Sequence, residues 1–110
     1  MILAGSKFKI DTNGLVITTP AYNEIADKLT TQEDFQREMQ ALLHRHINGD
    51  WGDVDPHDAR VNEQAVKSGA RIVSSYTVEG IKLWIISDAA YYDTAPELRQ
   101  VTTFLLPSDY

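Results

Sequence analysis

The sequence predicts an α+β fold in which three central helices pack on a mainly antiparallel sheet. Helical spacing of apolar residues is confined to the middle of the chain, and alternation with a period of two begins at Arg71. A short β-rich segment precedes the helices, so the expected order is strand, strand, helix, helix, helix, strand, strand, strand. At 110 residues the chain has the length of one small domain, and we expect a single domain over residues 1–110.

The first predicted element is a β segment that a turn interrupts. Two β-rich runs, Lys7–Ile10 and Leu15–Thr19, flank the sequence Asp11-Thr12-Asn13-Gly14. Asn-Gly favours a hairpin turn because both residue types tolerate positive φ. The segment is therefore either a small hairpin or one strand with a bend before it.

Three helices follow, and residues typical of helix ends delimit them. Pro20 suits a first helical turn, Asp55 suits an N-cap, and Gly49 and Gly69 suit left-handed C-terminal caps. The expected helices are Ala21 to Leu29, about Glu33 to Ile47, and Pro56 to Ser68.

From Arg71 onward the alternating pattern predicts strands. An antiparallel hairpin turns at Glu79-Gly80, and a polar interruption over residues 88–100 separates it from a last strand that Pro107 closes. The expected strands are Ile72–Val78, Ile81–Ser87 and Val101–Leu106.

Composition excludes several classes of protein. The chain has no cysteine, so disulfide frameworks, thiolate metal sites and cysteine nucleophiles are absent. Ten Lys and Arg against 16 Asp and Glu give a net charge of -6, which argues against direct binding of nucleic acid. Neither a signal peptide nor an apolar run of the roughly 18 residues that a membrane span needs is found, so we expect a cytoplasmic protein.

The most distinctive segment is the loop from Gly49 to Asp58, which is rich in aspartate and lies near histidines. His44 and His46 lie two residues apart on a helix and point about 200° away from each other, so they do not chelate one ion. The loop also lacks the glycine and terminal glutamate of a calcium-binding loop. We expect no metal and interpret the aspartates as caps and turn residues. The alternative is a metal-assisted hydrolase that uses His57 and the aspartates.

No other group of residues in the sequence suggests a catalytic site. Ser74, Ser75 and Ser87 lie in or at the ends of strands without a glycine-flanked elbow, and no phosphate-binding glycine motif occurs. Asn62 and Glu63 suit a solvated helix face better than a polar catalytic pair. We therefore expect no catalytic residue and no cofactor.

The two tryptophans are expected to be structural. Trp51 is interpreted as a core residue, because Gly49 and Gly52 on either side allow the backbone to approach another element closely. Trp84 lies between Leu83 and Ile85, which indicates a central strand or one covered on both faces.

A wider pattern resembles a known family. The family consists of short bacterial proteins called plasmid-related proteins, which plasmids, phages and integrated elements carry. The resemblance covers roughly Leu15 to Tyr110 and rests on the runs Gly49–Val54, Asn62–Ala65, Arg71–Tyr76, Lys82–Ile86 and Val101–Pro107. It implies an accessory protein of a mobile genetic element and assigns no catalytic residue. This chain departs from the pattern at Ala89 to Gln100, where the family has a short charged turn.

These observations predict a small acidic, non-enzymatic protein that binds another protein. The expected partner is a nucleic-acid-binding host defence complex, such as a CRISPR effector or a restriction enzyme, which the chain would inhibit by direct contact. The predicted contact residues are Asp50, Asp53, Asp55 and Asp58 in the acidic loop, and Tyr91 and Tyr92 in a loop whose aromatic and acidic residues suit a protein interface. A homodimer that pairs through a sheet edge or through the Tyr91-Tyr92 loop is a further alternative.

Overall fold

The computed structural model describes residues 6–29 and 32–110. It confirms the α+β class. The elements, in chain order, are β1 (Lys9–Thr18), α1 (Pro20–Leu29), α2 (Gln32–Ile47), α3 (Pro56–Ser68), β2 (Ile72–Val78), β3 (Ile81–Ser87), β4 (Leu98–Leu105) and a short 3-10 helix, Pro107–Asp109. Among the described residues, no helix has both the length and the apolar character that crossing a membrane requires.

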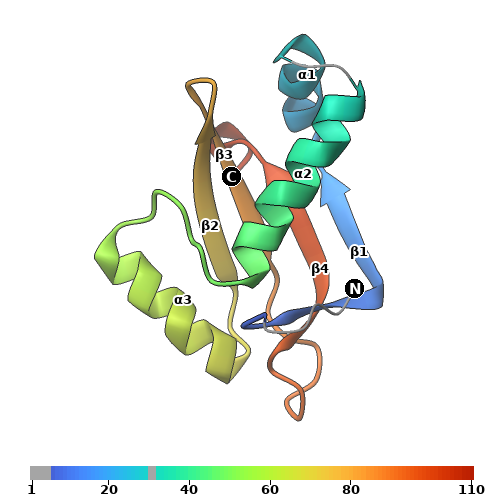
Figure 1. Cartoon of the computed structure of the whole chain (residues 1–110). Coiled ribbons are helices and arrows are strands. Elements are labelled where there is room, and N and C mark those ends of the chain that lie inside the picture. Colours follow the sequence, from blue (N-terminus) through green and yellow to red (C-terminus); the bar gives the residue numbers. More distant parts are fainter. Residues whose placement is uncertain (1–5, 30–31) are drawn as a thin grey trace.

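The four strands form one mixed sheet in the order β1-β4-β3-β2 (Figure 1). β2 pairs with β3 and β3 pairs with β4 in antiparallel fashion, as the predicted hairpin requires, whereas β1 pairs with β4 in parallel. β4 begins at Leu98, three residues before the predicted start of the last strand, because Leu98 and Arg99 pair with the first residues of β1.

Of the two alternatives predicted before the helices, the structure has one strand with a bend, β1, so the two strands in the predicted order are a single element. Both halves of β1 pair with β4 in the same direction, and the register shifts between Ile10 and Leu15. The extra residues form a bulge in which a Cβ on Gly14 would lie 2.4 Å from the backbone oxygen of Gln100. Asp11 accepts a hydrogen bond from the Gln100 amide at 2.7 Å, so contacts with β4 hold the bend.

The predicted helix ends are largely confirmed. Thr19 Oγ1 accepts a hydrogen bond from the backbone N–H of Tyr22, two residues after Pro20. Asp55 is the N-cap of α3, accepting the N–H of Asp58 at 2.8 Å, and Gly69 closes α3 with φ 84°.

α1 and α2 lie on one face of the sheet, and α3 lies at its β2 edge. α2 crosses this face, α1 lies near the end of β1, and α3 lies beside β2 (Figure 1). The buried core joins aromatic and aliphatic side chains of α1, α2 and the strands, among them Tyr22, Ile47, Tyr76, Ile85 and Phe104. Because β2 residues alternate between faces, Ser74 and Tyr76 face α2, whereas Val73 and Ser75 face the opposite side.

Arg99 is fully buried, and backbone carbonyl groups satisfy its guanidinium. It donates to the carbonyl oxygens of Pro96 at 2.9 Å, Ala70 at 2.6 Å, Ala65 at 2.9 Å and Asp88 at 3.2 Å. Burial lowers the pKa of Arg99. Arg99 thus ties the segment from Asp88 to Pro96 to the end of α3, where Ala90 N–H also donates to Gly69 O at 2.7 Å.

β2 is an outer strand of the sheet, and other parts of the chain cover most of its outer edge. The side-chain amide of Asn62 exchanges hydrogen bonds with the backbone of Val73, at 2.8 and 3.1 Å. Next to it, Ser75 N–H donates to Trp51 O at 3.1 Å and Ser75 O accepts from Asp53 N–H at 2.6 Å. Asn62 is buried, so its interpretation as part of a solvated helix face is wrong: its amide replaces a neighbouring strand.

Candidate functional site

The acidic loop between α2 and α3 is held in place by a brace around Asp50. The Arg45 guanidinium donates to both Asp50 carboxylate oxygens, at 2.7 and 3.2 Å, and this hydrogen bonding holds the pKa of Asp50 below its usual range. Arg45 also lies over the ring of Tyr76, whose hydroxyl donates to Asp50 O at 2.6 Å. The charge of Asp50 is therefore neutralised within the chain.

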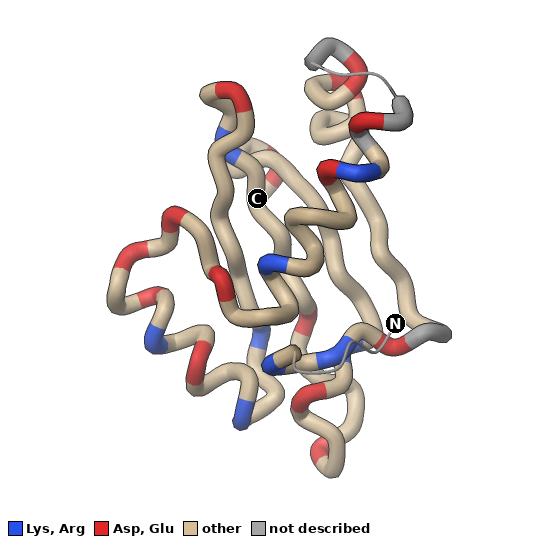
Figure 2. The backbone as a smooth tube through the Cα atoms, viewed as in Figure 1, with Lys and Arg blue, Asp and Glu red and all other residues tan. Residues whose placement is uncertain are grey.

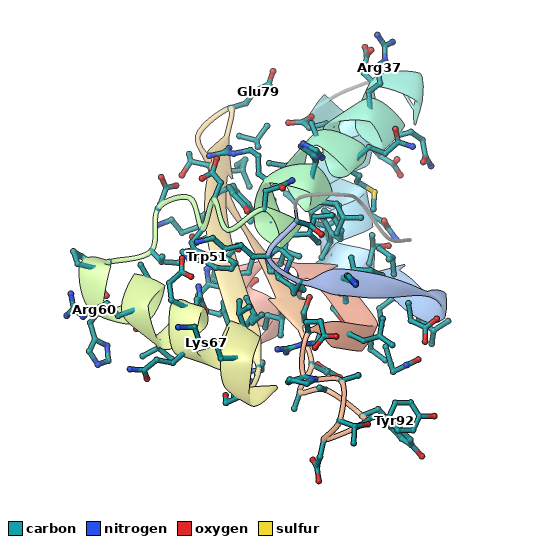
Figure 3. All side chains as sticks on the ribbon, turned by 60° about the horizontal axis from the view of Figure 1, so that its bottom comes forward. Arg37, Trp51, Arg60, Lys67, Glu79 and Tyr92 are labelled. Atoms are coloured by element: carbon teal, nitrogen blue, oxygen red, sulfur yellow. The ribbon has the colours of Figure 1, made fainter. Side chains whose placement is uncertain are left out.

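Trp51 anchors this loop in the core, as the sequence predicts. Its indole is buried and lies against the rings of Phe8 and His46, with centroids 6.3 and 6.2 Å away (Figure 3). Gly52, at φ 73°, passes so close to β2 that a Cβ there would lie 2.0 Å from Ser75 O. The predicted close backbone approach is thus made at Gly52.

The three remaining aspartates of the predicted site stay exposed. Asp53 accepts a hydrogen bond from Thr77 Oγ1 at 2.7 Å, Asp55 caps α3, and Asp58 lies 3.3 Å from His57 Nδ1. Figure 2 shows acidic residues along this loop and the start of α3. Unlike Asp50, none of these three pairs with a lysine or arginine among the described ion pairs.

These aspartates form one rim of a groove of about 540 Å³ between α3 and the face of the sheet that points away from α2. β2 and β3 supply its floor through Val73, Ser75, Trp84 and Ile86, which share a face because Ser75 pairs with Trp84 and Val73 with Ile86. The remaining lining includes two cations and a second aromatic ring: Arg71, Lys82 and Tyr110.

The floor of the groove has features typical of a binding surface. The Trp84 ring is half-buried and meets Tyr110 edge to face at 5.5 Å, while Arg71 lies over Tyr110 at 5.1 Å. Ser75 is 6% exposed, yet its hydroxyl has no hydrogen-bond partner. The hydroxyl oxygen is itself buried, so the polar groups that the groove exposes to solvent are the three aspartates, Arg71 and Lys82.

The start of α3 brings together three residues that could serve as ligands in the alternative metal site. Ligand atoms of Asp55, His57 and Asp58 lie within 4.8 Å of one another, and all three side chains are exposed. Asp55 already accepts the N–H of Asp58, so one of its oxygens serves the helix cap. The capping role predicted for Asp55 is thus confirmed, whereas the Asp58 carboxylate lies beside the His57 ring.

The second predicted contact region lies at the other end of the molecule. Tyr91 and Tyr92 are 74% and 54% exposed, and Tyr92 stands at the far end of the 88–97 loop (Figure 3). Their rings meet edge to face at 4.9 Å and border a shallow hollow of about 390 Å³ with Leu15 and Val101. The two predicted regions therefore form separate surfaces.

Sequence reasoning missed a buried polar network around His46. His46 Nδ1 lies 2.5 Å from Ser74 Oγ, its Nε2 lies 3.0 Å from Ser87 Oγ, and Ser87 bonds to Thr102 at 2.8 Å. All four side chains are fully buried, so this histidine and its serines have no route to a substrate. The signal was present in the sequence, because His46 lies on the apolar stripe of α2 with Leu42, Leu43 and Ile47.

Burial of His46, reinforced by the nearby charge of Arg99, lowers its pKa to about 3. The unfolded chain binds a proton here near pH 6.5 and the folded chain does not, so acid favours unfolding. We expect urea unfolding to show stability falling by up to about 1.4 kcal/mol per pH unit as pH drops below 6.5.

A His46→Gln variant, which has no proton to gain, should show a flatter profile between about pH 7 and pH 5, above the range in which most carboxylates titrate. His44→Gln, at an exposed position of the same helix, should keep the wild-type slope. Equal slopes for wild type and His46→Gln would contradict the attribution of this pH dependence to the lowered pKa of His46.

Comparisons of this chain with protein-family models, with curated proteins and with solved structures find no match.

Proposed function

We propose that this chain is a non-enzymatic binding protein that docks its acidic groove on a basic surface of a partner protein. The observation that carries the proposal is the combination of three exposed carboxylates, Asp53, Asp55 and Asp58, with the Trp84 and Tyr110 rings in one groove. Charge at the rim speeds encounter with a basic partner, and a central aromatic supplies burial energy once water is excluded.

The proposal uses three of the four predicted aspartates. All four aspartates are exposed, but Asp50 is a poor contact residue because Arg45 already pairs with it, whereas the other three have no lysine or arginine partner among the described ion pairs. Arg71 and Lys82 line the same groove, so a partner that matches it presents basic groups toward the aspartates and an acidic or polar group toward these cations. Such mixed complementarity supplies specificity in addition to attraction.

The partner class follows from charge and from the family resemblance. A protein whose basic groove ordinarily binds a phosphate backbone offers the complementary surface, and the net charge of -6 disfavours direct contact with the nucleic acid itself. The resemblance to plasmid-related proteins favours a host defence complex, such as a CRISPR effector or a restriction enzyme, as the target. Tyr91 and Tyr92 provide a second contact region for a large partner.

The test compares two variants that carry the same change in net charge. The groove variant is Asp53→Asn, Asp55→Asn and Asp58→Asn, in which asparagine preserves the cap of α3. The control is Asp27→Asn, Glu79→Gln and Asp88→Asn, at exposed positions that do not line the groove. Tagged proteins are used to capture partners from nuclease-treated host lysate, and affinities for the purified partner are then measured.

We expect the groove variant to bind at least about tenfold more weakly than wild type, equivalent to about 1.4 kcal/mol, and the control to bind within about twofold. Equal losses in both variants would indicate that net charge alone drives binding. The proposal would be contradicted if the groove variant bound the partner with the affinity of wild type. It would also be contradicted if nuclease treatment of the lysate abolished capture of the partner, because the contact would then depend on nucleic acid.

A further inference from the structure

The two edges of the sheet are built differently. At the β2 edge, Asn62 and the Trp51–Asp53 segment satisfy the outward backbone groups of Val73 and Ser75. At the opposite edge, within residues 6–29 and 32–110, nothing pairs with the outer side of β1 from Leu15 to Thr18 (Figure 1). An open edge is a template for another strand, and proteins usually block one with charge, proline or a covering segment.

The open stretch of β1 is apolar and uncharged. Leu15, Val16 and Ile17 are 59%, 43% and 43% exposed, and no charged residue occurs from Gly14 to Pro20. This length of strand is uniformly tan in Figure 2, although the chain as a whole carries a net charge of -6. The usual charged protection against strand addition is therefore missing here.

The distribution of charge on the chain indicates which kind of molecule can pair with this edge. Two acidic molecules repel each other across most of their surfaces, and an uncharged strip is where such copies approach at least cost. A basic partner would find no opposite charge on this strip. Identical strands pair antiparallel about a two-fold axis, so each contact is made twice and the pairing closes without further growth.

We propose that a second copy of this chain occupies the edge, with the two β1 strands pairing antiparallel about a two-fold axis at Val16. Leu15 then lies opposite Ile17 of the partner subunit on one face, and the two four-stranded sheets become continuous. Leu15 adjoins Tyr91 and Tyr92 at the hollow described above, so these apolar side chains extend the contact beyond the strand. The inference is independent of the groove, and it assigns Tyr91 and Tyr92 to the contact between copies instead of to the groove's partner.

Position 16 offers a direct test because the chain has no cysteine. A Val16→Cys variant carries one thiol at the two-fold axis, where directly opposed cysteines lie close enough for a disulfide. Val61→Cys, at the 45% exposed Val61 of α3, is the matched control. Under mild oxidation we expect Val16→Cys to form a covalent dimer at least about tenfold faster than Val61→Cys, and equal rates would overturn the proposal.

Mass in solution provides the second measurement. At about 100 µM, light scattering should give wild type a mass of twice 12.4 kDa, because even a micromolar dimer is nearly complete at that concentration. Ile17→Lys should give the monomer mass and Val61→Lys the dimer mass, since a buried lysine at the edge opposes pairing. A monomeric wild type, or a dimer that Ile17→Lys leaves intact, would overturn the proposal.

Discussion

Replacement of Arg99 with methionine is expected to lower the free energy of unfolding by about 3–5 kcal/mol. Methionine fills a similar volume, so the loss comes from the donors rather than from packing. Without them, buried carbonyl oxygens of the α3 end, of Ala70 and of the 88–97 loop lose their partners. Each such acceptor costs about 1–3 kcal/mol, partly offset where water enters.

A matched substitution separates this effect from a general intolerance of arginine loss. Arg60 lies exposed on α3, and Arg60→Met should change the stability by less than about 0.5 kcal/mol (Figure 3). Arg99→Lys should fall between the two, because an ammonium group keeps the charge but lacks the planar fork of donors. Urea unfolding of the three variants measures all these differences, and similar stabilities for Arg99→Met and Arg60→Met would contradict the role of Arg99.

Gly52→Ala is expected to destabilise the protein by about 3–5 kcal/mol. A methyl group there would lie 2.0 Å from Ser75 O and 2.6 Å from the Tyr76 ring, so the loop must move away from β2. That movement breaks the hydrogen bonds of Ser75 with Trp51 and Asp53, and positive φ adds about 1 kcal/mol of strain. The same movement displaces the acidic rim, so the variant should also bind the groove's partner more weakly.

Gly80 provides the control for backbone strain. Its φ of 80° resembles the 73° of Gly52, but a Cβ at Gly80 meets nothing within 4 Å. Gly80→Ala should therefore cost only the roughly 1 kcal/mol of the left-handed conformation. If thermal and urea unfolding show equal losses for both alanine variants, steric contact between Gly52 and β2 is not the cause.

Features that depend on neighbouring residues in the sequence were predictable. Asp55 and Gly69 mark the ends of α3 because a cap acts within one helical turn. The β2-β3 hairpin follows from strict alternation around Glu79-Gly80. Trp51 is in the core, and the glycine next to it makes the close approach that its position in the sequence suggested.

Features that depend on distant residues were not predictable. The sequence left open whether the segment before Gly14 was a hairpin turn or a bend in one strand, and contacts with Gln100 on β4 make it a bulge in one strand. Asn62 and Arg99 are polar residues that sequence patterns assign to the surface, yet backbone groups far along the chain pair with them. The aspartates of the groove lie close together in the sequence, which made them visible as one acidic loop, whereas Trp84 and Ser75 join the groove only through the pairing of β2 with β3.

The parallel pairing of β1 with β4 has a consequence for the order of folding. Leu15 pairs with Val101, so nearly the whole chain lies between two neighbouring strands. Closing so long a loop costs chain entropy, and contacts between the two strands offset this cost only when they dock together. Pairing of β1 with β4 is therefore slower than pairing of strands that are close in the sequence. We therefore expect the local hairpin of β2 and β3 to form before β1 finds its neighbour, since β1 has no strand to pair with until β4 is synthesised.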